Sequence, residues 1–410
     1  MNCILIINSK GIVQYGRSGV VKGQSMNSLP VLENGWILIE GDHIHSYGHM
    51  DEVYHGMVTD VIDATGCYVL PSWCDSHTHI VYAGSREREF VDRIHGLTYE
   101  EIAKRGGGIL NSAKKLQETS EDELFDQALI RLDDVMRTGT GAIEIKSGYG
   151  LSYDAELKML QVIKRLKKAS PLTIKATFLG AHAMPTEFKE NRNAYIDLLV
   201  NRLLPEIADK NLADYNDVFC DRGFFTVDET DRILDAGNKL GIQPKIHANE
   251  LDYSGGIQVG VKHNALSVDH LEFTGEEEIK CLQNSNTMPT LLPSTAFFLK
   301  LHYPPARKMI DAGLPIALSS DYNPGSSPSG KMSFILSLAC LNLGMTPEEA
   351  INAATLNSAY AMGVMNELGS LMPGKKANLF ITKPIPSLAF IPYSFTSDPI
   401  DKVIINGKLQ

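Results

Sequence analysis

The sequence predicts an α/β protein in which a (β/α)₈ TIM-like barrel carries a small β-sandwich domain formed by both ends of the chain. Three observations predict this architecture. The middle of the chain alternates apolar, strand-like runs with amphipathic segments, which is typical of a parallel sheet covered by helices. Both ends contain short strand-like runs separated by turn signals. The length of 410 residues suits a barrel of about 250 residues with a second layer of structure.

The barrel is expected to occupy residues 68–355. Amphipathic segments separate most of its strands, and Glu121–Arg137, Asp154–Lys167 and Asp228–Leu240 are examples. Eight strand–helix units predict that the parallel sheet closes into a barrel. The eight strand candidates are Tyr68–Asp75, Gly141–Lys146, Leu172–Gly180, Asp217–Cys220, Gln243–Ala248, Ala265–Asp269, Thr287–Leu292 and Pro315–Ser320.

The terminal β-sandwich is expected to combine residues 1–67 with residues 356–410. Both ends are rich in strand-like sequence and neither is large, so we expect them to pack together as one domain. The strand candidates in these ends are Cys3–Asn8, Gly35–Glu40, His43–Tyr47, Ala377–Thr382 and Lys402–Ile405.

The composition narrows the classes of function. A net charge of −11 argues against a general nucleic-acid or membrane binder, because both need a basic surface. A small anionic substrate stays compatible with this charge, because a metal ion and one or two arginines can reverse its sign inside a pocket. The sequence shows neither a run of ~18 apolar residues nor a signal-peptide pattern. Six scattered cysteines without a CxxC pair predict reduced thiols and a cytoplasmic protein.

The sharpest chemical signal is the pair His77 and His79 at the end of the first barrel strand. Side chains two residues apart on a strand point the same way, about 6.6 Å apart along the chain, so two imidazoles can converge on one ion. Taken alone, an HxH pair is weak evidence, and His43 and His45 have the same spacing. We expect this second pair to face solvent in the terminal β domain.

Position favours the metal-binding interpretation of the first pair. Catalytic residues of barrel enzymes lie at the carboxyl ends of the strands. A single histidine there is more often an ordinary core residue, but five strand ends with His or Asp are hard to reach by chance. Besides the first strand, the ends in question carry His182, His247, His270 and Asp321. Three nitrogen ligands and one carboxylate are a typical donor set for a transition metal.

These residues resemble the pattern of the amidohydrolase superfamily. His77, His79, His247, His270 and Asp321 match its ligand and catalytic positions. Asn249 and Asn378 depart from the pattern, since an acidic residue is usual at both places. Longer similar strings span most of the chain, namely Ala83–Phe90, Lys146–Leu151, Gly180–His182 and Ser320–Ser326.

The resemblance implies one divalent ion, Zn or Fe, held by His77, His79, His247 and Asp321. No lysine follows the fourth strand in a position suited to a bridging carbamate, so a second metal is not expected. A bound divalent metal lowers the pKa of its water to about 7, which supplies hydroxide for attack on a ring carbonyl.

Three residues are expected to carry the proton transfers. Glu250 is expected to protonate the leaving nitrogen, and His270 to accept a proton from the water or polarise the carbonyl. Asp321 is expected to hold the nucleophile as well as the metal. All three remain candidates for the main general base.

The resemblance further implies a small anionic heterocyclic substrate, an imidazolone with a propionate tail, whose ring C–N bond is hydrolysed. Arg86 suits the carboxylate as a bidentate partner, whereas without the resemblance it would be interpreted as a surface salt bridge to Glu87 or Glu89. A homodimer is also implied. The substrate-binding residues expected from the resemblance are Arg86, Tyr149, His182, Glu250, Asn323, Gly325 and Ser326.

Two other functions compete with this one. A metal-dependent deaminase of a heterocyclic base would share the histidines, Glu250 and Asp321, but a neutral base needs no carboxylate clamp of Arg86, Tyr149 and His182. A non-catalytic scaffold of the same fold would have lost its metal, and the intact ligand set argues against it.

Overall fold

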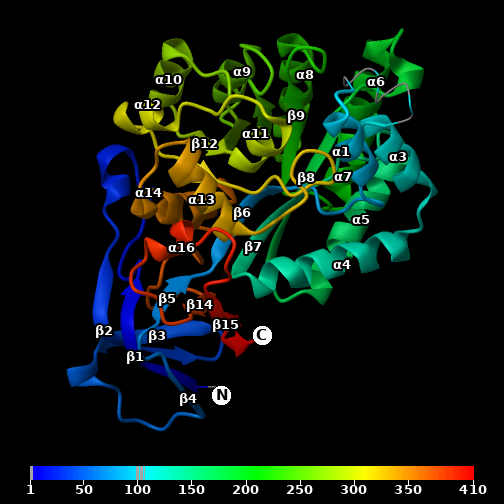
Figure 1. Cartoon of the computed structure of the whole chain (residues 1–410). Coiled ribbons are helices and arrows are strands. Elements are labelled where there is room, and N and C mark those ends of the chain that lie inside the picture. Colours follow the sequence, from blue (N-terminus) through cyan, green and yellow to red (C-terminus); the bar gives the residue numbers. More distant parts are fainter. Residues whose placement is uncertain (1–2, 98–100, 102–104, 106) are drawn as a thin grey trace.

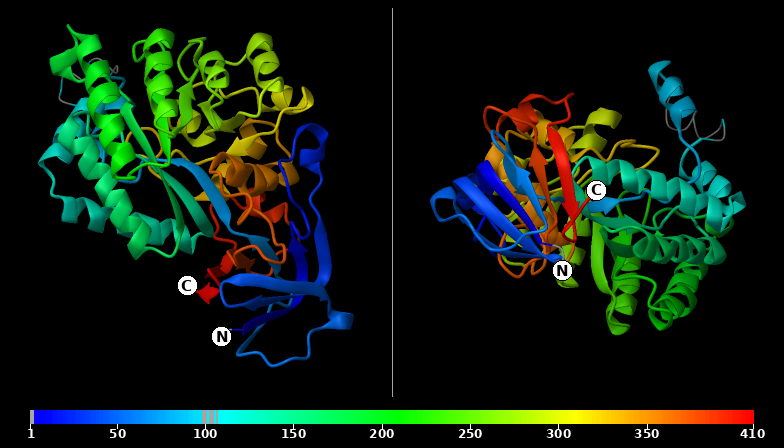
Figure 2. Two further views of the ribbon diagram at one scale, coloured as in Figure 1. Left: turned by 180° about the vertical axis from the view of Figure 1, so that it is seen from behind. Right: turned by 90° about the horizontal axis from the view of Figure 1, so that it is seen from below.

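The computed structural model describes residues 3–97, 101, 105 and 107–410. It confirms the predicted fold class, because eight parallel strands form a nearly closed barrel and strands from both ends of the chain form a separate mixed sheet (Figure 1). Helices surround the barrel, and both termini lie at the terminal sheet (Figure 2). Within the described residues, no helix is both long and apolar enough to cross a lipid bilayer.

Hydrogen bonds link the barrel strands in chain order from the first to the last. The two ends of this series meet through backbone bonds, because Asp321 N donates to His77 O at 3.0 Å and His79 N donates to Tyr322 O at 2.9 Å. Closure therefore brings the first histidine pair next to the last predicted ligand. The barrel strands are β6 Trp73–Thr78, β7 Thr140–Lys146, β8 Thr173–Ala181, β9 Tyr215–Cys220, β10 Gln243–Ala248, β11 Ser267–His270, β12 Met288–Leu291 and β13 Ala317–Leu318.

The helices follow the predicted periodicity. The helix α4 spans Glu121–Arg137, as expected; its amino end is capped by Ser120, and its buried residues Leu124, Ala128 and Leu132 recur every four positions. The other helices of the barrel region are α1 Glu87–Ile94, α3 Ile109–Glu118, α5 Tyr153–Ala169, α6 Arg192–Leu198, α7 Leu204–Asp209, α8 Val227–Lys239, α9 Gly256–Lys262, α10 Glu276–Gln283, α11 Pro293–Leu299, α12 Ala306–Asp311, α13 Met332–Asn342, α14 Pro347–Asn352 and α15 Ser358–Ala361; α16 Phe390–Tyr393 lies nearer the C-terminus.

One predicted strand, Tyr68–Asp75, is two strands in the structure. Its first half, β5 Tyr68–Pro71, joins the terminal sheet, and only the second half enters the barrel as β6. Pro71 has no N–H to continue a ladder, and the next amide, of Ser72, donates to Asn378 O at 3.0 Å. In the sequence only Pro71 and Ser72 interrupt the apolar residues at this change of sheet. The domain division at residues 67/68 and 355/356 stays a prediction.

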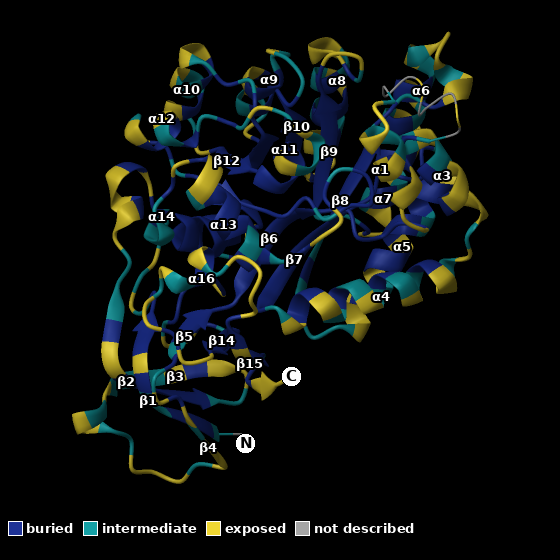
Figure 3. Cartoon of the chain, viewed as in Figure 1, coloured by how far each residue is buried: buried dark blue, intermediate teal, exposed yellow. Residues whose placement is uncertain are grey.

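The expected terminal β domain is present as one continuous mixed sheet. Its edge strand β3 returns to the C-terminal segment, where His43 bridges Lys376 and Ala377 N donates to Asp42 O at 2.8 Å. The two layers expected of a sandwich are thus parts of one sheet that curls over its own hydrophobic core. Buried residues fill the interior of this sheet and, separately, that of the barrel (Figure 3). The strands are β1 Cys3–Val13, β2 Val31–Glu40, β3 His43–His49, β4 Asp60–Asp63, β5, β14 Leu379–Thr382, β15 Ile400–Ile405 and β16 Lys408–Leu409.

Candidate metal centre and active site

Three predicted ligands, His77, His79 and His247, converge at the carboxyl ends of β6 and β10. The Nε2 atom of His79 lies 3.3 Å from that of His77 and 3.4 Å from that of His247. One ligand atom from each of the three lies within 4.8 Å of the others, as required of a site that binds one ion. By contrast, His43 and His45 are half exposed in the terminal sheet, as expected.

Asp321 completes this cluster from the loop after β13. Its Oδ1 lies 3.5 Å from Nε2 of both His77 and His79, while its Oδ2 accepts a hydrogen bond from Thr295 at 2.5 Å. The residue has a left-handed backbone (φ 53°), which turns the chain at the strand end. The carboxylate is therefore held with one oxygen free to face the histidines.

The protonation states suit a metal. Burial, followed by the charges of neighbouring groups, holds the pKa values of His77 and His79 well below the ordinary value, so both rings stay neutral. Burial raises the pKa of Asp321 to about 6. Neutral imidazoles whose Nε2 atoms face one another, beside a carboxylate, form a donor set that fits Zn or Fe.

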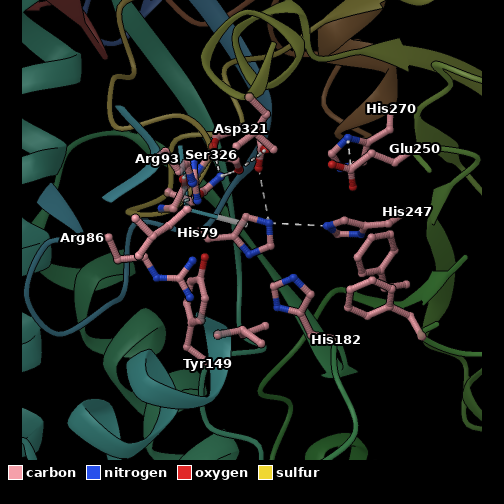
Figure 4. Close-up of a pocket in the computed structure, with 17 residues that line it drawn as sticks. His79, Arg86, Arg93, Tyr149, His182, His247, Glu250, His270, Asp321 and Ser326 are labelled. Atoms are coloured by element: carbon pink, nitrogen blue, oxygen red, sulfur yellow. Dashed lines mark hydrogen bonds and ion pairs between the residues drawn. The ribbon is translucent and has the colours of Figure 1, made fainter. Parts of the chain in front are cut away.

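A cavity of about 390 Å³ opens in front of this cluster (Figure 4). Every predicted site residue except His77 lines it, and His77 lies fully buried behind His79. Its lining combines charged and polar groups with apolar side chains, as is usual for a small-molecule site. The lining residues that the sequence analysis did not single out are Arg93, Leu97, Ile109, Phe219, Phe224 and Leu299.

Arg86 lies on one side of the cavity, beside Tyr149 (Figure 4). Its Nε donates to Ser112 Oγ at 2.9 Å and lies 3.6 Å from Glu89 Oε1, so the salt bridge considered above is partly present. Its Nη2, however, is buried and has no hydrogen-bond partner among the described residues. This guanidinium nitrogen therefore keeps a donor that no described residue uses.

The loop after β13 is folded by Asn323. The Asn323 side chain accepts from Gly325 N at 2.7 Å and Ser326 N at 2.8 Å, and it donates to Asp321 O and Ser326 Oγ, both at 2.7 Å. Its amide is thus occupied within the loop. This loop carries Asp321, Gly325 and Ser326 to the cavity wall.

Glu250 and His270 lie on the other side of the cluster from Arg86 (Figure 4). Their nearest charged atoms, Oε2 and Nδ1, are 3.7 Å apart. Burial, and then the charges of Asp321 and Asp221, raise the pKa of Glu250, so this carboxyl group holds its proton more firmly than an ordinary glutamate. Burial, followed by the charge of His247, lowers the pKa of His270 well below its ordinary value.

Asp221 is a functional residue that the sequence analysis did not identify. Its Oδ2 accepts from the amides of Glu250 at 2.7 Å and Leu251 at 2.9 Å, which fixes the loop that carries Glu250. The departure at Asn249 has a related role, because its left-handed backbone (φ 56°) suits asparagine and its side chain donates to Phe273 O at 2.9 Å. A carboxylate at a strand end was the one available signal for Asp221.

His182 stacks on His79, with the ring centroids 5.2 Å apart and the planes 14° from parallel. Its Nδ1 lies 3.0 Å from Gly148 O, and because a carbonyl only accepts, Nδ1 carries the hydrogen. Burial lowers the pKa of His182 to about 3, so the ring is neutral and Nε2 keeps a lone pair. His182 is therefore built as an acceptor at Nε2.

A model of the amidohydrolase family matches residues 68–409. The chain belongs to the amidohydrolase family, and the expected enzyme class, a hydrolase, is confirmed.

Curated relatives cover nearly the whole chain. The imidazolonepropionase of Flavobacterium johnsoniae is 56% identical over 407 residues, which are 99% of each chain. The imidazolonepropionase of Geobacillus kaustophilus is 44% identical over 391 residues, 94% of this chain and 92% of that protein. Guanine deaminase of E. coli has a TM-score of 0.76 at 12% identity, over 100% of this chain and 99% of that chain, and shows the fold alone.

Proposed function

We propose that this protein catalyses the imidazolonepropionase reaction, the hydrolytic ring opening of 4-imidazolone-5-propanoate to N-formimidoyl-L-glutamate in histidine degradation. One observation carries the proposal beyond the family: one cavity is lined by His79, His247 and Asp321 and also by Arg86, whose buried Nη2 has no hydrogen-bond partner among the described residues. The cavity thus offers a hydrolytic centre together with a site for a carboxylate tail. The relatives that share this chain over nearly its full length carry the same activity in their names.

His77, His79, His247 and Asp321 would hold one Zn or Fe ion, which fits the neutral imidazoles of His77 and His79 and the free oxygen of Asp321. When bound, such an ion makes water nucleophilic at neutral pH. Elemental analysis of the purified chain distinguishes Zn from Fe.

The substrate is held by groups on two sides. Arg86 pairs with the propionate through its guanidinium, and Tyr149 adds a phenol donor, which stays protonated because burial raises its pKa. His182 accepts a hydrogen bond from a ring N–H at Nε2. Phe219 and Phe224, whose ring centroids lie 4.1 Å apart in the cavity wall, pack against the heterocycle.

Glu250 and His270 move the protons of the reaction. Water adds its oxygen to the ring carbonyl carbon and the C–N bond breaks, so that a new carboxylate forms and the leaving nitrogen gains a proton. Glu250, whose raised pKa keeps it protonated, supplies that proton. His270, which is neutral, accepts the proton of the attacking water or donates to the carbonyl oxygen. Asp321 remains the third candidate for the base.

Three further properties belong to this proposal. The resemblance supports a homodimer, the six free cysteines support a cytoplasmic location, and the net charge of −11 supports a small-molecule substrate rather than nucleic acid or a membrane surface. Sedimentation of the purified chain tests the dimer.

The proposal is tested by spectrophotometric turnover of imidazolone propionate by the purified, metal-loaded chain. We expect rapid loss of the imidazolone absorbance without release of ammonia, and a much slower reaction with an imidazolone that lacks the tail. Preference for a neutral amino-heterocycle with release of ammonia would replace this proposal with the deaminase function. A chain that binds no metal and turns over neither substrate would favour the scaffold.

A further inference from the structure

A cluster of five ionisable side chains that contact one another lies fully buried inside the barrel, next to the metal ligands, and the proposed mechanism does not use it. They are three carboxylates and two lysines, and each has no exposed surface. Isolated charges are too costly to bury, so such a group persists only through its internal pairing. Its contacts therefore indicate what the cluster does. The five residues are Glu144 and Lys146 of β7, Asp217 of β9, Lys245 of β10 and Asp269 of β11.

Two of the carboxylates face the ligating histidines from behind. Asp269 Oδ2 lies 2.7 Å from Nδ1 of His77, and Asp217 Oδ2 lies 3.0 Å from Nδ1 of His247. Asp217 also accepts from the backbone N–H of His247 at 3.1 Å, through Oδ1. The hydrogen bond to Asp269 keeps the ring hydrogen of His77 on Nδ1 and leaves the lone pair of Nε2 for a metal. The Nδ1 of His247 makes no hydrogen bond to a described residue, so Asp217 holds that residue through its backbone N–H and through the close contact at the ring.

Lys146 contacts both of these carboxylates at the same oxygens that face the histidines. Its Nζ lies 2.8 Å from Asp217 Oδ2 and 3.5 Å from Asp269 Oδ2, and it donates to Glu144 Oε1 at 2.7 Å. Burial alone would lower the pKa of Lys146, but the charges of Asp217, Glu144 and Asp269 outweigh it, so the pKa is raised and the ammonium persists. The single ammonium of Lys146 thus contacts both Asp217, which faces His247, and Asp269, which faces His77.

The second lysine of the cluster has another role. Lys245 pairs with Glu144 Oε2 and donates to the backbone carbonyls of Ser76 at 3.1 Å and Ala361 at 3.2 Å. It ties the strands together from the far side of Glu144. The contact that joins the two aspartates is therefore made by Lys146.

We propose that Lys146 is a positioning residue that fixes Asp217 and Asp269 behind His247 and His77 and thereby sets the affinity of the site for its metal. Without the ammonium, Asp217 and Asp269 lose the cation that their Oδ2 atoms share, although Lys245 and the Ser267 hydroxyl still act on Asp269. The two carboxylates are then free to turn apart, which loosens the rings of His77 and His247 that they face. The inference rests on the proposed function only in taking the histidine cluster as a metal site.

The test compares Lys146→Met with Lys375→Met, a matched loss of a buried lysine away from the cavity. Lys375 is 7% exposed, and its Nζ donates to Met365 O at 2.6 Å and to Leu368 O and Ser370 Oγ, both at 2.9 Å. Metal-free proteins are titrated with Zn²⁺ in competition with a chromophoric chelator, and their thermal unfolding is followed in parallel. We expect Lys146→Met to raise the Zn²⁺ dissociation constant about 10- to 100-fold. Lys375→Met should lower Tm and leave the dissociation constant unchanged.

Asp269→Asn provides a second variant that keeps the side-chain shape, in case Lys146→Met does not fold. It should weaken Zn²⁺ binding in the same range, and the double variant should weaken it by less than the product of the two effects, because both act on one contact. A folded Lys146→Met or Asp269→Asn protein with wild-type Zn²⁺ affinity overturns the inference.

The outcome is separable from the proposed function. A wild-type chain that binds Zn²⁺ tightly but does not open imidazolone propionate defeats the proposed function and leaves the affinity comparison intact. A wild-type chain that binds no Zn²⁺ defeats both.

Discussion

Gly325 passes so close to Arg86 that a Cβ atom on Gly325 would lie 2.2 Å from Nη1 and 3.2 Å from Cζ of the guanidinium. The carbonyl oxygen of Gly325 also accepts from Arg93 Nη1 at 3.3 Å. The resemblance assigned Gly325 to the substrate. In the structure its missing side chain makes the space in which Arg86 faces the cavity.

Gly325→Ala should therefore act through Arg86. The backbone of Gly325 is outside the left-handed region, so alanine is tolerated, but its methyl group displaces the guanidinium. We expect kcat/KM for imidazolone propionate to fall on the order of 10-fold, chiefly through KM, with little change in Tm, since a charged hydrogen bond is weakened. Steady-state kinetics with the tailed and tail-less imidazolones measure this. Equal losses for both compounds, or none for either, would contradict the role given to Gly325.

Arg86→Met should remove the carboxylate partner itself. A charged hydrogen bond contributes roughly 1.5–3 kcal/mol, so kcat/KM should fall about 10- to 100-fold while metal content is kept. Arg86→Lys should recover only part of the loss, because an ammonium lacks the bidentate fork. The tail-less imidazolone is the control, and its kcat/KM should change little in either variant. If it suffers as much as the tailed substrate, Arg86 is structural.

Glu250→Gln and His270→Asn should keep the metal and lose turnover. Both side chains line the cavity without belonging to the ligand cluster, and each is proposed to move a proton. We expect kcat to fall on the order of 10²-fold or more. Metal analysis and kcat measured on the same preparations check this, with Tyr253→Phe on the neighbouring exposed loop as a control. Normal turnover by either variant would remove that residue from the mechanism.

Metal affinity should depend on pH through Asp321. Burial raises its pKa to about 6, so below that pH the carboxyl group must release a proton before it can bind a cation. The affinity should therefore be constant above about pH 6 and fall about 10-fold per pH unit below it, while His77 and His79, with pKa values well below the ordinary one, add no break there. Chelator competition between about pH 5 and 8 measures the profile. Asp321→Asn should bind more weakly and lack the break; a wild-type break near the ordinary Asp pKa would refute the assignment.

Metal content should approach one ion per chain. Three histidines lie around one position with Asp321 beside them, and the buried Lys146 and Lys245 are paired with carboxylates rather than placed between two ions. Elemental analysis of purified protein measures the content and decides between Zn and Fe. His247→Ala should lose metal and activity together, whereas a reproducible wild-type value near two would rule out a mononuclear site.

Local sequence patterns were sufficient for the fold class and for the ends of the barrel strands that carry chemistry. The predicted helix Glu121–Arg137 and strand Gln243–Ala248 have the bounds found in the structure. Hydrophobic periodicity predicts these elements correctly because each one buries one face, and the spacing of apolar residues along the chain shows which face is buried. The split of Tyr68–Asp75 was not predicted because the residues on both sides of Pro71 and Ser72 are mostly buried, and no local pattern shows that they belong to different sheets.

The sequence by itself determined which side chains stand at the strand ends, since strand and parity follow from local spacing. Only the tertiary structure decided which of them meet. Asp269 supports His77 from 192 positions away, and Asp217 supports His247 from another strand. The physical reason is closure of the barrel: hydrogen bonding between strands sets which buried polar groups face one another, and those pairings depend on chain segments that no local pattern connects.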